Sequence, residues 1–154
     1  MQSNSPSLHH SNTPSSEVAA GLLFRAGKLL ITQRRDQGHL ANLWEFPGGK
    51  LEAGETFEQC LGRELREELG IDVAVGELAE ELTHHYSERS VHLKFFRCTL
   101  VEHEPQPIGC QAVVWVTADQ LARYPFPAAD ERVLAKLRAN AQWWRDTRSD
   151  GVVE

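Results

Sequence analysis

Apolar residues gather in short runs along the chain, and most of these runs have the length of β-strands. Residues 18–24 and 29–32 are apolar on either side of the turn Arg25–Lys28, which predicts a β-hairpin. The largely polar residues 33–45 show no clear period and predict an exposed loop. Further strands are predicted at residues 71–75, 78–85, 91–100 and 112–116.

The segment 57–69 combines helical spacing with signals for a helix start and a helix end. Its apolar residues recur at the helical period and define one buried stripe: Phe57, Leu61, Leu65 and Leu69. Thr56 can cap the first turn, with Gln59 completing a capping box, and Gly70 tolerates the left-handed conformation that ends many helices.

Two more helices are expected near the C-terminus. The first is short, begins at Thr117 or Asp119 and reaches Tyr124, and the second covers residues 128–144. Strands mixed with helices indicate the α/β class. Because helices must cover both apolar faces of a sheet, we expect an α/β/α sandwich around a mixed β-sheet.

The length of 154 residues suits one domain, which we place at residues 17–144. Residues 1–16 are polar and Ser-rich and predict a disordered N-terminal tail, and residues 145–154 predict a frayed C-terminal tail. The N-terminal residues lack the basic start and apolar stretch of a signal peptide. No apolar run approaches the roughly 18–20 residues of a membrane span.

Charge and cysteine content exclude several classes of protein. The formal net charge is −6, so a nucleic-acid binder with a basic face is not expected, and an anionic ligand would need cations to mediate. Cys60, Cys98 and Cys110 are odd in number and lack CxxC spacing, which argues against a disulfide framework and a zinc site. We expect a cytoplasmic protein, without membrane or nucleic-acid partners, that is a monomer or weak homodimer.

Negative charge is concentrated between Gly48-Gly49 and Gly70. The glutamates of this segment are Glu52, Glu55, Glu58, Glu64, Glu67 and Glu68. Like charges at helical spacing repel each other. Either water solvates these carboxylates or metal ions neutralise them.

A helical wheel at about 100° per residue distinguishes these possibilities in part. Glu64 and Glu68 fall at the edge of the apolar stripe, and with Glu67 they form a cluster that can converge on one point, whereas Arg63 and Arg66 fall on the far face. Mg²⁺ prefers such carboxylate oxygens. The alternative is a solvated helix stabilised by pairs such as Arg63 with Glu67. Charge clustering alone favours the solvated helix, and the wheel position favours metal.

The segment resembles the Nudix box, Gly-x5-Glu-x7-Arg-Glu-U-x-Glu-Glu-x-Gly-U with U aliphatic. The matching residues are Gly49, Glu55, Arg63, Glu64, Leu65, Glu67, Glu68, Gly70 and Ile71. At roughly 7% usage per residue type, the seven fixed identities coincide by chance about once in 10⁸ windows. No fixed position is broken, so the motif is specific.

The resemblance extends over roughly residues 17–138 and is to the MutT-type branch of this family, the nucleotide-pool sanitisers that hydrolyse oxidised dGTP. The segments that carry it outside the box are residues 31–35, 39–42, 45–50 and 126–130. It implies the Nudix fold, a nucleoside triphosphate as substrate, and a role in DNA replication and DNA repair.

The resemblance also implies residue roles. The implied ligands of Mg²⁺, or alternatively Mn²⁺, are Gly48, Glu64, Glu67 and Glu68. Arg63 would orient this cluster, and Gly49 and Glu55 would support the geometry of loop and helix. Attack of water at the β-phosphorus would give a nucleoside monophosphate and pyrophosphate, with Glu64 or a close neighbour as the candidate general base.

Three residues are implied to contact the nucleotide. Arg34 matches a phosphate-contacting arginine, Arg89 a residue near the base, and Phe46 a residue lining the base pocket. The alternatives are solvated arginines at residues 34 and 89 and a core phenylalanine at residue 46.

Two positions depart from the MutT-type pattern. Gly109 stands where many members have a further glutamate that binds metal or assists as base, and Glu102 and Glu104 are candidates to compensate. Asp130 stands where the oxidised-dGTP enzymes have asparagine. An ionised aspartate only accepts hydrogen bonds, so it can take the N7–H of 8-oxoguanine or an exocyclic amine of cytosine or adenine.

The sequence therefore predicts a Mg²⁺-dependent nucleoside triphosphate pyrophosphohydrolase that acts on oxidised nucleotides such as 8-oxo-dGTP. The alternative within the same chemistry is a pyrophosphohydrolase for cytidine nucleotides (CTP, dCTP or 5-methyl-dCTP) directed by Asp130. An alternative of another class is a non-catalytic module that recognises 8-oxoguanine. The unbroken glutamates and the lack of a basic face argue against that module.

Overall fold

The computed structural model describes residues 15–145 and contains a seven-stranded mixed sheet. The strands are β1 (Ser15–Arg25), β2 (Lys28–Gln33), β3 (Trp44–Glu45), β4 (Gly48–Lys50), β5 (Asp72–His85), β6 (Ser90–Glu102) and β7 (Ala112–Val116). They follow the order β3-β2-β1-β6-β5, with β4 also paired to β1 and β7 to β2. β1 and β6 run parallel, and the other pairings among the described residues are antiparallel.

The described part of the chain begins earlier than the predicted domain. β1 already includes Ser15 and Ser16, two residues before the expected boundary, and the final helix extends to Arg145. The rest of the two predicted tails lies outside the described residues. Within residues 15–145, no helix is long and apolar enough to cross a membrane.

The predicted hairpin forms between β1 and β2, with Phe24 opposite Leu29 and Arg25 opposite Lys28. Both residues of its turn have positive φ, 52° at Ala26 and 79° at Gly27. A two-residue turn of this kind matches the right-handed twist of the strands that it joins.

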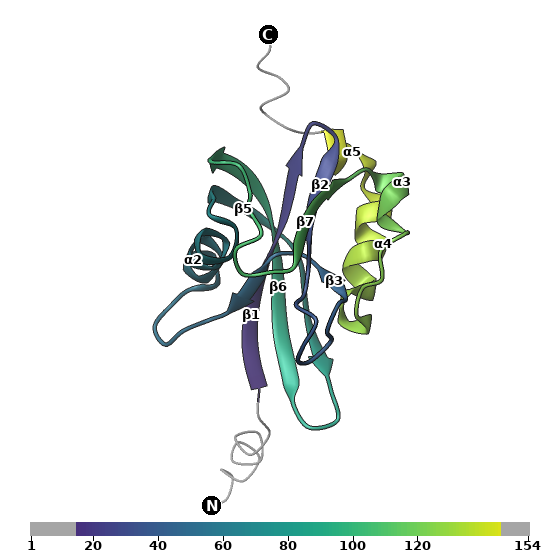
Figure 1. The fold of residues 1–154 in the computed structure, drawn as a ribbon. Coiled ribbons are helices and arrows are strands. Elements are labelled where there is room, and N and C mark those ends of the chain that lie inside the picture. Colours follow the sequence, from purple (N-terminus) through teal and green to yellow (C-terminus); the bar gives the residue numbers. More distant parts are fainter. Residues whose placement is uncertain (1–14, 146–154) are drawn as a thin grey trace, which may run out of the picture.

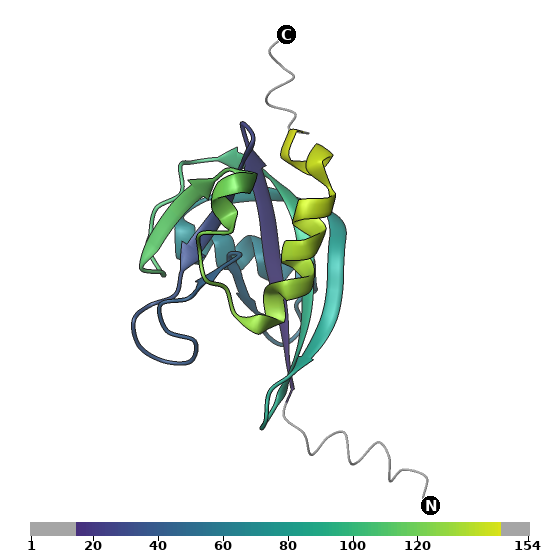
Figure 2. The same cartoon turned by 90° about the vertical axis from the view of Figure 1, so that its right-hand side faces the viewer.

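Helices cover both faces of the sheet (Figures 1 and 2). They are α2 (Phe57–Leu69), α3 (Ala118–Leu121), the 3₁₀ turn η1 (Ala128–Asp130), α4 (Glu131–Ala139) and α5 (Ala141–Arg145). Figure 1 shows α2 on one side of the sheet and α4 on the other. This arrangement confirms the predicted α/β/α sandwich.

Alternation along the central strands fills two separate cores. Leu22 of β1 and Leu29 of β2 pack toward α4, together with Val133. Leu23 and Leu30, the next residues along, pack toward α2. Because successive side chains of a strand point to opposite faces, adjacent leucines of one strand pack into different cores.

Helix α2 begins and ends where its sequence predicts. The Thr56 hydroxyl accepts from the Gln59 N–H and the Gln59 side chain accepts from the Thr56 N–H, which completes the capping box. Gly70 has φ of 70° and its N–H donates to the Arg66 carbonyl. Leu61, Leu65 and Leu69 are fully buried, as the stripe predicts.

Several predicted bounds are wrong. The strands expected at 71–75 and 78–85 form the single strand β5, which begins at Asp72, because its pairing with β6 tolerates register shifts around Leu78. The short helix α3 ends at Leu121 and does not reach Tyr124. The single helix expected at residues 128–144 is divided into η1, α4 and α5, since Asn140 has non-helical angles of φ −118° and ψ 69°.

Candidate active site

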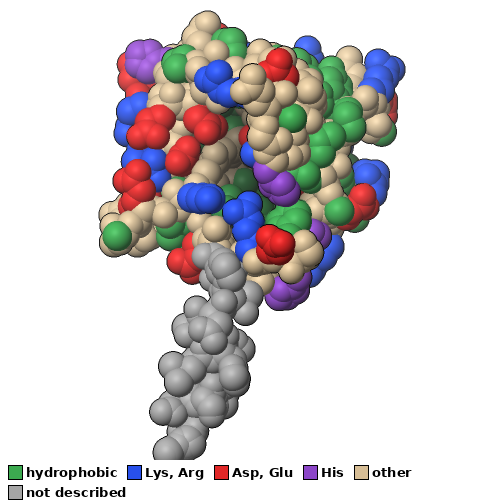
Figure 3. All heavy atoms as spheres, turned by 60° about the horizontal axis from the view of Figure 1, so that its bottom comes forward, with side chains coloured by type: hydrophobic (Ala, Val, Ile, Leu, Met, Phe, Trp, Pro, Cys, Tyr) green, Lys and Arg blue, Asp and Glu red, His purple; other side chains and the backbone are tan. Residues whose placement is uncertain are grey.

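A cavity of about 270 Å³ brings together residues from distant parts of the chain. It is bordered by β1, the loop after β2, β3 and β4, helix α2, the β5–β6 turn, β6 and η1. In the space-filling view, acidic side chains gather on one side of a hollow, with Lys or Arg and His side chains along its opposite edge (Figure 3). The motifs noted in the sequence therefore meet in one place.

The two glycines before the helix allow a close approach of three elements. A Cβ atom on Gly48 would overlap the backbone of Ala19 and Ala20 on β1. A Cβ atom on Gly49 would overlap the carboxylate of Glu64. Strand β4 is thus held between β1 and α2, and the Glu64 carboxylate fills the space that glycine leaves.

Arg63 is the centre of a network of carboxylates. Its guanidinium donates to both oxygens of Glu55, at 2.6 and 3.0 Å, and to the Glu64 carboxylate at 3.0 Å and that of Glu67 at 3.1 Å. It also donates to the Lys50 carbonyl at 3.0 Å. These bonds lower the pKa of Glu55 to about 2.

The wheel position predicted for Arg63 is therefore misleading. The side chain is 21% exposed, because its length lets it fold back from the far face toward Glu55 and Glu64. Arg66, predicted on the same face, does remain 65% exposed and pairs with Asp72 at 2.9 Å.

Glu64 and Glu68 form a close carboxylate pair. Each carboxyl group perturbs the pKa of the other, so the two side chains lie close together. Burial, then the charges of Glu64 and Glu45, raise the pKa of Glu68 to about 8. Burial is also the main cause of the raised pKa of Glu64. Two half-buried carboxylates held together in this way are strong candidates for a cation site.

The donor set fits a hard divalent cation, which prefers carboxylate and carbonyl oxygens. Of the predicted ligands, Gly48 and Glu68 line the cavity. Glu64 and Glu67 do not line it: the Glu64 carboxylate lies against Gly49, and Glu67 is 59% exposed and pairs with Arg63. Among the described residues, the group whose ligand atoms all lie within 4.8 Å is Asp72, Glu102 and His103, outside this cavity. We favour Glu64, Glu67 and Glu68, because exposed acidic groups cluster without metal on many surfaces.

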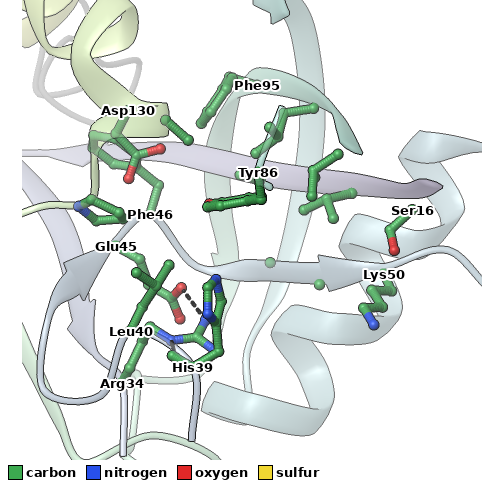
Figure 4. A pocket seen from close by; sticks show the side chains of 18 of the residues that line it. Ser16, Arg34, His39, Leu40, Glu45, Phe46, Lys50, Tyr86, Phe95 and Asp130 are labelled. Atoms are coloured by element: carbon green, nitrogen blue, oxygen red, sulfur yellow. Dashed lines mark hydrogen bonds and ion pairs between the residues drawn. The ribbon is translucent and has the colours of Figure 1, made fainter. Parts of the chain in front are cut away.

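Arg34 enters the cavity paired with an acid that the sequence did not single out. Its guanidinium donates to Glu45 at 2.9 Å (Figure 4) and to the His39 carbonyl at 3.1 Å. Burial raises the pKa of Glu45 despite this partner. The charge of Glu45 also contributes to the raised pKa values of Glu68 and Asp130.

Asp130 and Phe46 lie together at one end of the cavity, away from Lys50 and Ser16 (Figure 4). Phe46 is 4% exposed and stacks on Phe126, with ring centroids 5.0 Å apart. Asp130 is 6% exposed, and burial followed by the charge of Glu45 raises its pKa to about 7. An apolar wall beside a buried carboxyl group is suited to reading a base edge.

Arg89 lines the cavity, and so do many residues to which the sequence analysis assigned no role, among them His39, Leu40, Lys50 and Tyr86. The His39 and Tyr86 rings meet edge to face at 5.1 Å, which joins the loop after β2 to the β5–β6 turn. Residues 39 and 40 were part of the family resemblance, but nothing local in the sequence indicates that Tyr86 reaches this loop.

Gly109 lies against the end of α2. A Cβ atom there would come within 3.1 Å of Glu68 Cγ, and the Gly109 N–H donates to the Glu68 carbonyl at 2.9 Å. The two acids considered as replacements lie elsewhere: Glu104 pairs with Arg25 at 2.9 Å, and Glu102 belongs to the exposed group with Asp72. Neither lines the cavity.

Comparison with known proteins gives a consistent result. Residues 19–136 match the NUDIX domain family. The CTP pyrophosphohydrolase of Escherichia coli is 41% identical over 128 residues, which cover 80% of this chain and 91% of that protein. The 8-oxo-dGTP diphosphatase of the same organism is 38% identical over 123 residues, covering 79% and 95%.

Among solved structures, the E. coli ORF135 protein superimposes with a TM-score of 0.72 at 38% identity, covering 84% of this chain and 93% of that one. The matched family, the relatives and this structure agree with the unbroken box at residues 49–71. The chain therefore belongs to the Nudix family and is a Nudix hydrolase, with MutT-type 8-oxo-dGTP diphosphatases among its relatives.

Proposed function

We propose that this chain is a Mg²⁺-dependent nucleoside triphosphate pyrophosphohydrolase, which converts a nucleoside triphosphate and water to a nucleoside monophosphate and pyrophosphate. The observation that carries the proposal is that one cavity contains Glu68 of the box and, at another part of its wall, the buried Asp130 beside Phe46. Phosphates can therefore meet the carboxylates while the base meets Asp130.

Gly48, Glu64, Glu67 and Glu68 are the residues that would hold the metal. A divalent ion held there would supply Lewis-acid chemistry to the phosphates and lower the pKa of a bound water. Glu64 is the candidate general base, since its carboxylate lies against Gly49, which lines the cavity. Arg63 orients Glu64 and Glu67 through the bonds described above, and Glu55 holds Arg63 in turn.

The cations of the cavity are suited to the phosphates. Arg34, Lys50 and Arg89 line it from three different segments. Arg34 has its guanidinium on Glu45 and would reorient toward a phosphate, for which arginine offers a bidentate fork. We assign phosphate contact to Arg34 and a position near the base to Arg89.

We propose an oxidised purine nucleotide such as 8-oxo-dGTP as the substrate. Asp130 can accept the N7–H that 8-oxoguanine carries and guanine lacks. Its raised pKa also leaves part of the population protonated near neutral pH, so that the side chain can donate as the family's asparagine does. The 8-oxo-dGTP diphosphatase relative supports this choice. The enzyme would then sanitise the nucleotide pool, as a cytoplasmic monomer or weak homodimer.

A second candidate substrate is a cytidine nucleotide: CTP, dCTP or 5-methyl-dCTP. Asp130 favours this substrate, because an ionised carboxylate accepts a hydrogen bond from the exocyclic amine of cytosine. The 41% identity with a CTP pyrophosphohydrolase supports it as well. A non-catalytic recognition module is not proposed, since relatives matched over more than nine-tenths of their length are hydrolases.

A panel of nucleotides tests the function and separates the two substrates. Purified protein with Mg²⁺ is given 8-oxo-dGTP, dGTP, CTP, dCTP and 5-methyl-dCTP, and pyrophosphate release is measured at several concentrations. We expect the highest kcat/KM for 8-oxo-dGTP. A higher value for a cytidine nucleotide would replace the first substrate with the second, and no pyrophosphate from any nucleotide would refute the proposal.

A further inference from the structure

A buried carboxylate on the edge strand β5 has no part in the site described so far. Glu80 has a side-chain exposure of 7%, although β5 carries mostly exposed residues around it. Ala79 and Glu80 are both buried, which breaks the alternation of a regular strand. The break has a local cause: Leu78 pairs with Phe96 and Glu80 with Phe95, so Ala79 is an extra residue in β5.

Glu80 binds two cations of helix α4. Its two oxygens lie 2.7 Å from the Arg132 guanidinium and 2.8 Å from the Lys136 ammonium. Residues 132 and 136 are four apart and therefore share one face of the helix. Lys136 also donates to the Ala79 carbonyl at 2.8 Å. The hydrogen bond from Lys136 is the main cause that lowers the pKa of Glu80.

These bonds restrict rotations and shifts of α4 that its apolar contacts with the sheet would allow. Val133 and Leu137 bury the helix against the sheet. Burial of this kind is not directional, so it tolerates small rotations and shifts along the helix axis. Two charged hydrogen bonds to the separate oxygens of one buried carboxylate are directional and limit both movements.

Asp130 is the N-cap residue of the same helix, two residues before Arg132. Its side chain makes no capping hydrogen bond and is directed into the cavity instead (Figure 4). A shift of α4 would therefore move the Asp130 carboxyl group relative to Phe46 and Glu45. A displacement of about 1 Å at a recognition site changes affinity or rate strongly.

We propose that Glu80 is a positioning residue for base selection. With Arg132 and Lys136 it sets the position of α4 on β5 and thereby the position of Asp130 in the nucleotide pocket. The inference rests on the proposed function, because it assigns the accuracy of base reading to a contact outside the pocket. Glu80 itself does not line the cavity.

The test compares Glu80→Gln in two backgrounds, wild type and Asp130→Ala, which has no group to read the base, with the nucleotide that the wild type prefers. In the wild-type background we expect KM to rise about fivefold with kcat within about twofold, and in the Asp130→Ala background we expect KM to change less than about twofold. The matched control is Glu77→Gln on the same strand, whose carboxylate is 73% exposed and pairs with Arg97 at 3.2 Å. This control should leave KM unchanged.

A purely structural role for Glu80 would lower Tm and would change KM equally in both backgrounds, or in neither. Either result overturns the inference. If Glu80→Gln does not fold, Arg132→Gln gives the same comparison while Lys136 remains on Glu80. A wild-type protein that hydrolyses no nucleotide would refute the proposed function instead, so the two failures are distinguishable.

Discussion

The carboxylate of Glu64 occupies the space that a Cβ atom on Gly49 would fill. This contact joins β4 to α2 at the point where the glycine pair and the carboxylate cluster meet. Arg63 pairs with the same carboxylate at 3.0 Å. The position of Glu64, the candidate general base, therefore depends on the absence of a side chain at Gly49 and on the long side chain of Arg63.

Gly49→Ala is expected to reduce kcat by about 100-fold, because the new methyl group must displace Glu64 by an ångström or more. Gly62→Ala is the matched control, since no atom lies within 4 Å of a Cβ at that helical position. The control should keep full activity and gain about 0.5–1 kcal/mol in free energy of unfolding. Steady-state kinetics and thermal unfolding of both variants measure these effects. Wild-type kcat in Gly49→Ala would show that Glu64 can move without consequence.

Glu64→Gln and Glu68→Gln are each expected to lose about 10²–10⁴-fold in turnover. Mg²⁺ at 100 times its Kd should stabilise the wild type by about 2.7 kcal/mol, and these variants much less, because each removes a charged ligand. Thermal unfolding with and without Mg²⁺ measures this effect independently of activity. Glu58→Gln, on the exposed first turn of α2, should respond to Mg²⁺ as the wild type does. Full Mg²⁺ stabilisation of both site variants would place the metal elsewhere.

Arg63→Lys is expected to lower kcat/KM by about 10–100-fold, as changes in the partners of metal ligands commonly do. A lysine ammonium cannot reproduce the paired bonds to Glu55 together with those to Glu64 and Glu67. Arg66→Lys provides the comparison, because Arg66 is 65% exposed and contacts Asp72 outside the cavity. Equal activity of the two lysine variants would show that Arg63 does not orient the carboxylates of the site.

The stability of the protein should depend on pH through Asp130. Burial raises its pKa to about 7 from an ordinary value of 3.8, so the stabilisation present below pH 3.8 is lost as the pH rises through 7. Asp130→Asn removes this pH-dependent loss of stability, because asparagine does not titrate. Its Tm relative to wild type should therefore increase between pH 5 and pH 8, whereas exposed Asp119→Asn should show a constant difference. A pH-independent difference for Asp130→Asn would contradict the buried state of the carboxyl group.

Local signals in the sequence predicted the local features correctly. The capping residues Thr56 and Gln59 and the terminal Gly70 act within one helical turn, so the bounds of α2 follow from them. The hairpin turn at residues 25–28 and the capping of α3 by Thr117 are of the same kind. The box predicts Glu64, Glu67 and Glu68 as metal ligands from spacing along one helix, α2.

Features that depend on contacts between distant segments were not predictable. The union of residues 72–85 into one strand depends on pairing with β6, which tolerates the extra residue near Leu78. Arg63 reaches Glu55 because of the length and flexibility of its side chain, which a helical wheel does not represent. Glu45 of β3 and Tyr86 of the β5–β6 turn line the cavity from separate segments, and the buried Glu80 pairs with Arg132 and Lys136 of α4.

Hydrolysis in H₂¹⁸O tests the central claim most directly, because it reports both the bond that is cut and the phosphorus that is attacked. With 8-oxo-dGTP and Mg²⁺, we predict a nucleoside monophosphate without label and pyrophosphate that carries one ¹⁸O, as attack at the β-phosphorus requires. Mass spectrometry of the two products gives the answer in one reaction, and Glu64→Gln serves as the inactive reference. Release of orthophosphate with a nucleoside diphosphate, or label in the monophosphate, would contradict this account.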